Sequence, residues 1–376
     1  MPLYLTSAQV VSLDSALGFD AGRLGLATAL YFGLAAALAQ PVAATVTRVG
    51  AQTGMRAGAL LSLFGSGAAA TAGRWWAFPI AVALAGLANA FMQVSTNVAL
   101  ATGAAFHRQG VSFGAKQGAI PLAGAFAGAL LPSVGVAVGW RWPYVFAMAL
   151  AVVILFIAPE VEDRPLHTTR VPSRERPPLS RSLKFLALGG ACGGAAGNGL
   201  SLFLVLASVD IGTTEAVAGT VLAVGSALVF LLRVGVGAFA DRFESTGQRE
   251  MAVLLLLGAV ASFALSSVTS VEAFIVVMPL ALMGSWGWPG LIYFTVVRIH
   301  PEATARASGV ILASNLTGTL VGPSVVAQFA DRGQFASAWV FVGALSLSAA
   351  IFMTASWYAM PKSAATELPG VELERH

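Results

Sequence analysis

Charged residues are scarce in this sequence. Asp, Glu, Lys and Arg together make up 10% of its 376 residues, whereas soluble domains carry about a quarter. Hydrophobic residues make up 57%, and the mean hydropathy is +0.80. Apolar runs of about 18 or more residues recur along the chain, each long enough to cross a ~30 Å hydrocarbon core as a helix. The composition excludes a soluble globular protein and indicates one that crosses a membrane many times.

Cysteine and histidine are scarce too. Cys192 is the single cysteine, so no internal disulfide can form. The four histidines lie in predicted loops or the tail: His107, His167, His300 and His376. No Ser/His/Asp or metal-ligand spacing occurs inside an apolar run. These absences argue against a membrane-embedded enzyme, and we predict no cofactor and no metal site.

The apolar runs predict eleven complete membrane spans. These cover residues 23–42, 55–72, 76–103, 111–133, 142–159, 184–208, 214–238, 250–268, 271–297, 306–329 and 336–359. Ahead of them, residues 2–16 form an apolar stretch that is too short to span. The 41 glycines suit helices that pack closely within a bilayer.

The basic residues predict the orientation in the membrane. Of the 21 Lys and Arg residues, 15 lie in loops on one side and 4 on the other, while Lys116 and Arg233 fall inside spans. Loops rich in Lys and Arg stay in the cytoplasm. We therefore predict a multi-pass protein of the cell membrane, with its linker and C-terminus cytoplasmic. The net charge of +4 is then a topology signal, and no nucleic-acid partner is predicted.

Prolines and charges interrupt the apolar pattern once. The interruption divides the chain into an N-terminal helical half, a cytoplasmic linker, a C-terminal helical half and a cytoplasmic tail, which are residues 1–159, 160–183, 184–360 and 361–376. A repeat relates the halves at an offset of 194 or 195 positions. It pairs Arg48 with Arg242, Gly114 with Gly309, and Tyr144-Val145-Phe146 with Trp339-Val340-Phe341. Parallel repeats of this kind relate the halves of some transporters.

The same offset bears on the start of the chain. If Lys184 opens the seventh helix, the counterpart of that residue would precede Met1 by about a dozen positions. The first helix is therefore predicted to be truncated. A start codon placed too far downstream would explain this, because half a helix leaves backbone polar groups unpaired in lipid. The alternative is a chain that begins inside the bilayer.

The most specific motif is Gly237-Ala238-Phe239-Ala240-Asp241-Arg242, between the predicted spans 214–238 and 250–268. It resembles the signature loop of the major facilitator superfamily, and the predicted architecture resembles that family across nearly the whole chain. The resemblance implies an all-α polytopic membrane protein with two pseudo-symmetric six-helix halves. Here these halves would hold 11 complete spans and a truncated first one. It also implies a transporter that works by alternating access.

In that family the signature loop holds cytoplasmic helix ends together in the outward-open state. The resemblance thus implies gating roles for Gly237, Asp241 and Arg242, since a carboxylate near helix N-termini makes charge-assisted contacts. The family pattern continues with a glycine where Glu244 stands here. The first-half copy departs further, because alanine and threonine replace its leading glycine and its aspartate. Arg48 and Gly50 remain as its candidate gating residues.

Two narrower resemblances concern branches of the family. Residues 107–117, followed by Gly139-Trp140-Arg141-Trp142, resemble bacterial cyanate-permease-type members. Arg233 sits where monocarboxylate transporters carry an arginine that binds the substrate carboxylate. Those transporters have an aspartate four residues earlier, where this chain has Val229. Their proton-coupling pair is therefore not carried over.

Lys116 and Arg233 are the candidate anion-binding cations. Each lies 8 residues, or roughly 12 Å, from a predicted cytoplasmic helix end. The family fold implies that their two helices face each other, so both cations would project into one cavity. Buried cations without a counterion are costly, and a bound anion would offset that cost. The alternatives are that Lys116 snorkels to the membrane surface and that Arg233 bonds backbone carbonyls.

Further substrate-binding candidates are polar or aromatic residues inside predicted spans: Asn89, Gln93, Gln117, Asn198, Trp286 and Asn315. Two of them form a polar stripe with Asn97, because residues four apart share a helix face. Residues 285–289 interrupt the predicted span 271–297. At most one of Trp286 and Trp288 is expected to line the cavity. The alternative is that the polar residues bond neighbouring helices.

We predict a secondary active or facilitative transporter, or permease, for a small organic or inorganic anion. All 17 carboxylates lie in loops, tails or span ends, whereas cation and drug antiporters of this superfamily usually need an intramembrane carboxylate. Efflux of amphipathic compounds is the alternative, and it would need a larger, more apolar cavity with a carboxylate. A non-transporting sensor is a more distant one. The predicted partners are the substrate and the lipid bilayer, and the protein is predicted to be monomeric.

Overall fold

The computed structural model describes residues 2–103, 108–158, 179–243, 245–299 and 304–360. All regular elements in these ranges are helices: α1 (Pro2–Ala8), α2 (Val10–Leu17), α3 (Ala21–Val49), α4 (Ala51–Ala70), α5 (Ala77–Gly103), α6 (Gln109–Leu130), α7 (Trp142–Ile157), α8 (Arg181–Asp210), α9 (Glu215–Arg242), α10 (Gln248–Leu265), α11 (Val271–Trp286), α12 (Pro289–Ile299), α13 (Thr304–Ala330) and α14 (Phe335–Tyr358). A π-helical turn, Leu131–Gly135, extends α6. The predicted all-α fold is confirmed. The tail and residues 160–178 of the linker lie outside the described ranges.

Nine helical stretches in the described part of the chain are long and apolar enough to cross a membrane. Each coincides with a predicted span. The other two predicted spans, 55–72 and 142–159, overlap with α4 and α7. However, α4 has the length without the hydropathy, and α7 is only 16 residues long. Nine of the eleven predicted spans are therefore helical stretches with the length and the hydropathy of a membrane span. The other two, α4 and α7, each lack one of these two properties.

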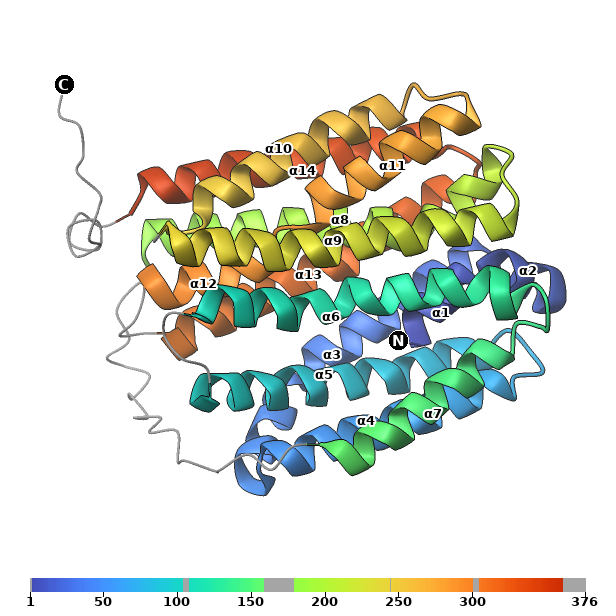
Figure 1. Cartoon of the computed structure of the whole chain (residues 1–376), viewed down its shortest axis with the longest axis horizontal. Coiled ribbons are helices and arrows are strands. Elements are labelled where there is room, and N and C mark those ends of the chain that lie inside the picture. The colour runs from blue at the N-terminus through green and yellow to red at the C-terminus, as the bar shows by residue number, and fades with distance from the viewer. Residues whose placement is uncertain (1, 104–107, 159–178, 244, 300–303, 361–376) are drawn as a thin grey trace.

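The helices lie side by side in one bundle, with α4 and α7 at one edge and α10 and α14 at the opposite edge (Figure 1). On the first side α5 packs on α3 and α4, and α4 packs on α7. On the other side α8 packs on α13 and α14, while α10 packs on α11 and α14. The pairs α6–α9 and α3–α13 join the two groups. These two pairs lie between the predicted halves, so they form the surfaces along which the halves would move.

Residues 2–17 contain two short helices, α1 inside this bundle and α2 at one end of it (Figure 1). All seven residues of α1 are buried. The Thr6 hydroxyl is 2.9 Å from the Tyr144 hydroxyl of α7, and Ser7 donates to the Leu202 carbonyl of α8. The helix α1 begins in the middle of the bundle rather than at its surface (Figure 1). The truncation of the first helix stays a prediction.

Glycines let neighbouring helices approach to backbone distance. A Cβ atom on Gly318 of α13 would lie 1.9 Å from the Ala191 carbonyl oxygen of α8. A Cβ atom on Gly86 of α5 would lie 2.3 Å from the Tyr31 carbonyl oxygen of α3. Close packing of this kind stabilises helix pairs in lipid, where no hydrophobic effect drives them together.

Replacing Gly318 by alanine should therefore push α13 away from α8. We expect the Gly318→Ala variant to lose about 1–3 kcal/mol of stability through overpacking. Gly309→Ala is the matched control, because it lies on the same helix and no neighbouring atom comes within 4 Å of the added Cβ. Thermal unfolding of the purified variants in detergent measures the difference. Equal melting temperatures for the two variants would contradict the proposed close contact.

Candidate functional site

A cavity of about 550 Å³ lies between the two groups of helices. All eight residues predicted to bind substrate line it: Asn89, Gln93, Lys116, Gln117, Asn198, Arg233, Trp286 and Asn315. They come from α5, α6, α8, α9, α11 and α13. Among the described residues that line the cavity there is no Asp or Glu. The fold thus gathers both intramembrane cations and the polar candidates around one space, and their role in binding stays a prediction.

Lys116 extends from α6 to α5. Its Nζ donates to the side-chain oxygen of Gln93 and, over 2.7 Å, to that of Asn97. The two acceptors are four residues apart on α5, so they present neighbouring amide oxygens. Amide oxygens are neutral and leave the charge of the ammonium uncompensated. An ammonium has three N–H donors, and these two bonds use two of them. Asn89, one turn further along α5, also lines the cavity.

Arg233 is 2% exposed and lies between α6 and α11. Its Nε and Nη2 donate to the Trp286 carbonyl oxygen over 3.1 and 2.5 Å, and its Nη1 donates to the Gln117 carbonyl oxygen. The guanidinium carbon is 5.2 Å from the centre of the Trp286 ring, within the range of a cation–π contact. This arrangement is the backbone-carbonyl alternative, although Arg233 also lines the cavity.

The predicted span 271–297 is broken at the cavity. The helix α11 ends at Trp286, and α12 begins at Pro289. Both Trp286 and Trp288 line the cavity, so the expectation that at most one would is wrong. That expectation assumed a continuous helix of ~3.6 residues per turn, and the break removes this relation. In a regular helix the Ser285 carbonyl oxygen would accept a hydrogen bond from the N–H of residue 289, but Pro289 has no N–H. Trp288 Nε1 donates to this oxygen instead, over 3.0 Å.

Three tyrosines of the cavity were not among the residues predicted to bind substrate. Tyr4, Tyr31 and Tyr293, from α1, α3 and α12, line it. They are three of the five tyrosines in the chain. Tyrosines in membrane proteins are enriched at the two membrane surfaces, so the position of Tyr31 well inside the span 23–42 was a usable signal. The three tyrosines add aromatic rings with hydroxyl groups to the cavity lining.

The second-half signature motif, predicted as a loop, forms the last turns of α9 and contacts the other group of helices through Asp241. The carboxylate accepts hydrogen bonds from the backbone N–H groups of Gly110 and Val111, each over 3.0 Å. These are among the first N–H groups of α6, which have no partner within the helix. The side chain of the N-cap residue, Arg108, makes no cap bond within the described residues. Asp241 therefore caps a helix of the opposite group.

Gly237 makes this approach possible. A Cβ atom on Gly237 would lie 2.4 Å from the Gly110 carbonyl oxygen, and one on Gly110 would lie 2.5 Å from the Gly237 carbonyl oxygen. Arg242 is exposed at the end of α9. The cap by Asp241 and the glycine contact together hold the ends of α6 and α9 against each other.

The first-half copy of the loop has a different geometry. Arg48 is exposed in the last turn of α3, and Gly50 connects α3 directly to α4. Gly50 has a φ of 86°, a conformation that favours glycine. Threonine at position 47 has no carboxylate with which to cap a helix. The gating role of Arg48 and Gly50 stays a prediction.

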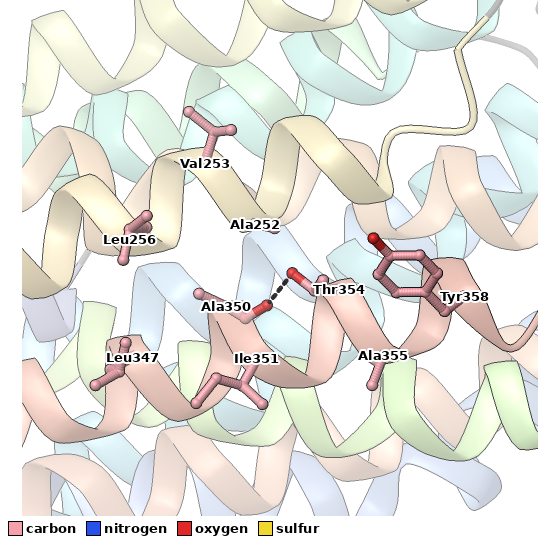
Figure 2. A pocket seen from close by; sticks show the side chains of 9 residues that line it. All are labelled: Ala252, Val253, Leu256, Leu347, Ala350, Ile351, Thr354, Ala355 and Tyr358. Atoms are coloured by element: carbon pink, nitrogen blue, oxygen red, sulfur yellow. Dashed lines mark hydrogen bonds between the residues drawn. The ribbon is translucent and has the colours of Figure 1, made fainter. Parts of the chain in front are cut away.

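A second hollow lies on the outer surface between α10 and α14 (Figure 2). Its lining is almost entirely aliphatic, and Leu256, Ile351 and Tyr358 are exposed. The Thr354 hydroxyl is bonded to the Ala350 carbonyl oxygen over 2.9 Å. An apolar outer groove of this kind suits contact with lipid chains. We therefore place the candidate site in the central cavity.

A helical membrane bundle with a central cavity lined by both polar and apolar side chains, closed by a cap between its two groups of helices, has the arrangement of a transmembrane transporter. Comparison with protein families supports this class. The family model described as Major Facilitator Superfamily matches residues 3–311, and the chain belongs to that family. It is a multi-pass membrane protein with that family's fold. No curated protein sequence matches it significantly.

Among solved structures, the human organic anion transporter MFSD10 (TETRAN) is similar to this chain. The TM-score is 0.65 and the sequence identity is 17%, over 92% of this chain and 89% of the human one. At this identity the likeness shows the shared fold alone. It does not select a branch of the family, so the cyanate-permease-like and monocarboxylate-transporter-like assignments stay predictions.

Removing the carboxylate of Asp241 should loosen the first turn of α6. We expect Asp241→Ala to destabilise this helix end by about 1 kcal/mol, as other lost N-terminal caps do. Hydrogen exchange of the Gly110 and Val111 amides, measured by mass spectrometry, should then be roughly five-fold faster. Asp210→Ala, at the end of α8, is the control. Unchanged exchange at residues 110–111 would show that Asp241 does not cap α6.

Proposed function

We propose that the protein transports a small organic or inorganic anion by alternating access, with Lys116 and Arg233 supplying the positive charge of the binding site. One observation carries this proposal. Two cations line a single cavity, and no carboxylate lines it among the described residues. A bound anion would be the counterion of this site.

The electrostatic argument depends on what already surrounds the two cations. Lys116 is bonded to amide oxygens, and Arg233 to carbonyl oxygens. Such dipoles stabilise a buried charge, but they do not neutralise it. Charged groups inside a membrane are costly and usually pair or serve transport. An anion entering the cavity would therefore meet a positive potential and at least one N–H donor of Lys116.

Neutral side chains around the cavity can orient the anion. Asn89, Asn198 and Asn315 line it from three different helices. Asn198 donates to the Gly194 carbonyl oxygen over 3.0 Å, so its side-chain oxygen and remaining N–H serve as further hydrogen-bonding groups. A carboxylate has about four lone-pair sites and can accept hydrogen bonds from several directions. Amides from three helices around the cavity would suit such an anion.

Alternating access would proceed by relative motion of the two predicted halves. The Asp241 cap on α6 joins them at the end of the bundle that the charge pattern predicts to be cytoplasmic. Opening the cavity on that side requires these bonds to break. Facilitated diffusion or exchange fits a cavity whose described lining residues include no carboxylate better than proton-coupled transport does. The organic anions named for the human structural neighbour agree with this proposal, although it rests on the cavity itself.

Uptake into proteoliposomes tests the anion site. Small carboxylates and inorganic anions would be screened with and without a pH gradient, together with a cationic amphipathic compound. We expect Lys116→Gln to raise the KM for the accepted anion about ten-fold or more, because a hydrogen bond to a charged group contributes about 1.5–3 kcal/mol. The neutral glutamine keeps a comparable length and can still bond the amides of α5.

Lys184→Gln is the matched control, since Lys184 is an exposed lysine on α8 outside the cavity lining. It should leave the KM unchanged. If Lys116→Gln and Arg233→Gln both leave transport of every accepted anion unchanged, the anion site is wrong. Transport of the cationic compound alone would instead favour the efflux alternative.

A further inference from the structure

Two backbone carbonyls beside the cavity lack the donor that a regular helix would give them. In α6 the carbonyl of Gln117 would accept from the N–H of residue 121, but Pro121 has none. The carbonyl of Trp286 belongs to the last residue of α11, where carbonyls have no intrahelical partner. Both positions are buried within the bundle. An unpaired carbonyl at such a depth costs free energy comparable to a lost hydrogen bond.

Arg233 donates to both of these carbonyls. Its Nη1 serves the Gln117 carbonyl, and its Nε and Nη2 serve the Trp286 carbonyl. The three groups belong to different helices, α6, α9 and α11, and α6 lies in the opposite predicted half from the other two. A planar guanidinium with five N–H groups in a fixed fork suits this task, because it can serve two acceptors in different directions at once.

The surrounding glycines show that α6, α9 and the break between α11 and α12 approach one another closely here. A Cβ atom on Gly114 of α6 would lie 2.5 Å from the Arg233 carbonyl oxygen. A Cβ atom on Gly290 of α12 would lie 3.1 Å from the Gly114 Cα. Arg233 thus occupies a junction where α6, α9 and the α11–α12 break approach to backbone distance.

We infer that Arg233 is a positioning residue that replaces two missing backbone N–H donors and thereby ties the Pro121 segment of α6 to the break between α11 and α12 across the interface between the halves. Its side chain fixes where Gln117 and Trp286 stand at the cavity wall. The inference rests on this hydrogen bonding, and it holds whatever solute the cavity accepts.

A double-mutant cycle tests the inference without any substrate. Arg233→Met removes the N–H groups while keeping a long side chain, and we expect its melting temperature in detergent to fall by about 5 °C. Pro121→Ala returns an N–H group to the Gln117 carbonyl. We therefore expect Pro121→Ala to raise the melting temperature clearly more in the Arg233→Met background than in the wild type.

Pro41→Ala is the matched control, because Pro41 is another proline inside a helix, exposed on α3 and outside the cavity lining. It should change the melting temperature equally in both backgrounds. If Arg233→Met yields too little folded protein, the same cycle is run with Arg233→Lys, whose ammonium lacks the guanidinium fork. In the Arg233→Met or Arg233→Lys background, Pro121→Ala must raise the melting temperature more than Pro41→Ala does. An equal or smaller increase overturns the inference.

Transport separates this inference from the proposed anion site. The restored backbone N–H carries no charge, so Pro121→Ala should recover stability in Arg233→Met without recovering the KM for an anion. Recovery of stability alone supports the positioning role, whatever Lys116→Gln does to transport. A missing rescue by Pro121→Ala would overturn the positioning role whatever the KM of Arg233→Met, and Lys116→Gln would still decide the anion site.

Discussion

Every backbone carbonyl and N–H group inside a bilayer has to find its partner within the protein, because lipid offers none. The most informative contacts of this structure are responses to that constraint. Where Pro289 withholds an N–H from Ser285, the indole of Trp288 supplies one. Where α6 begins without a local side-chain cap, Asp241 reaches over from α9. Backbone groups left unpaired at helix breaks and helix ends are thus bonded by side chains, and one of these residues, Asp241, belongs to the signature motif.

The same constraint explains how the two groups of helices can be held together and still be separable. Glycines let α6 and α9 approach to backbone distance, as at Gly114 and Gly237. The dispersion contacts made by such an approach are individually weak and short-ranged. The charge-assisted bonds to Gly110 and Val111 are stronger and few. Under the proposed cycle, opening would therefore break the bonds of Asp241 at one end, and it would also have to accommodate the bond from Arg233 to the Gln117 carbonyl between the predicted halves.

Much of this architecture could be predicted from sequence alone. Hydropathy located the helices. Polar, charged or aromatic residues inside the apolar runs were predicted to bind substrate, and all eight of them line the cavity. Hydropathy could not decide whether α4 and α7 cross fully, because these helices are respectively less apolar and shorter than the others. It also could not show what each cation contacts. The acceptors of Arg233 are backbone oxygens that no side-chain pattern marks, although Pro121 reveals one of them in retrospect. The breakdown of helical periodicity at Trp286–Trp288 likewise depends on backbone geometry.

The amide pair that holds Lys116 has an electrical consequence. Gln93 and Asn97 fix the ammonium in place without cancelling its charge, so under the proposed anion cycle the empty cavity is positive and a monovalent anion reduces that charge by one unit. The transmembrane voltage acts on any net charge that is relocated, with about 2.3 kcal/mol per charge per 100 mV. The loaded and empty carriers would therefore respond differently to voltage during reorientation. The membrane potential could then set the direction of net flux without any coupling ion.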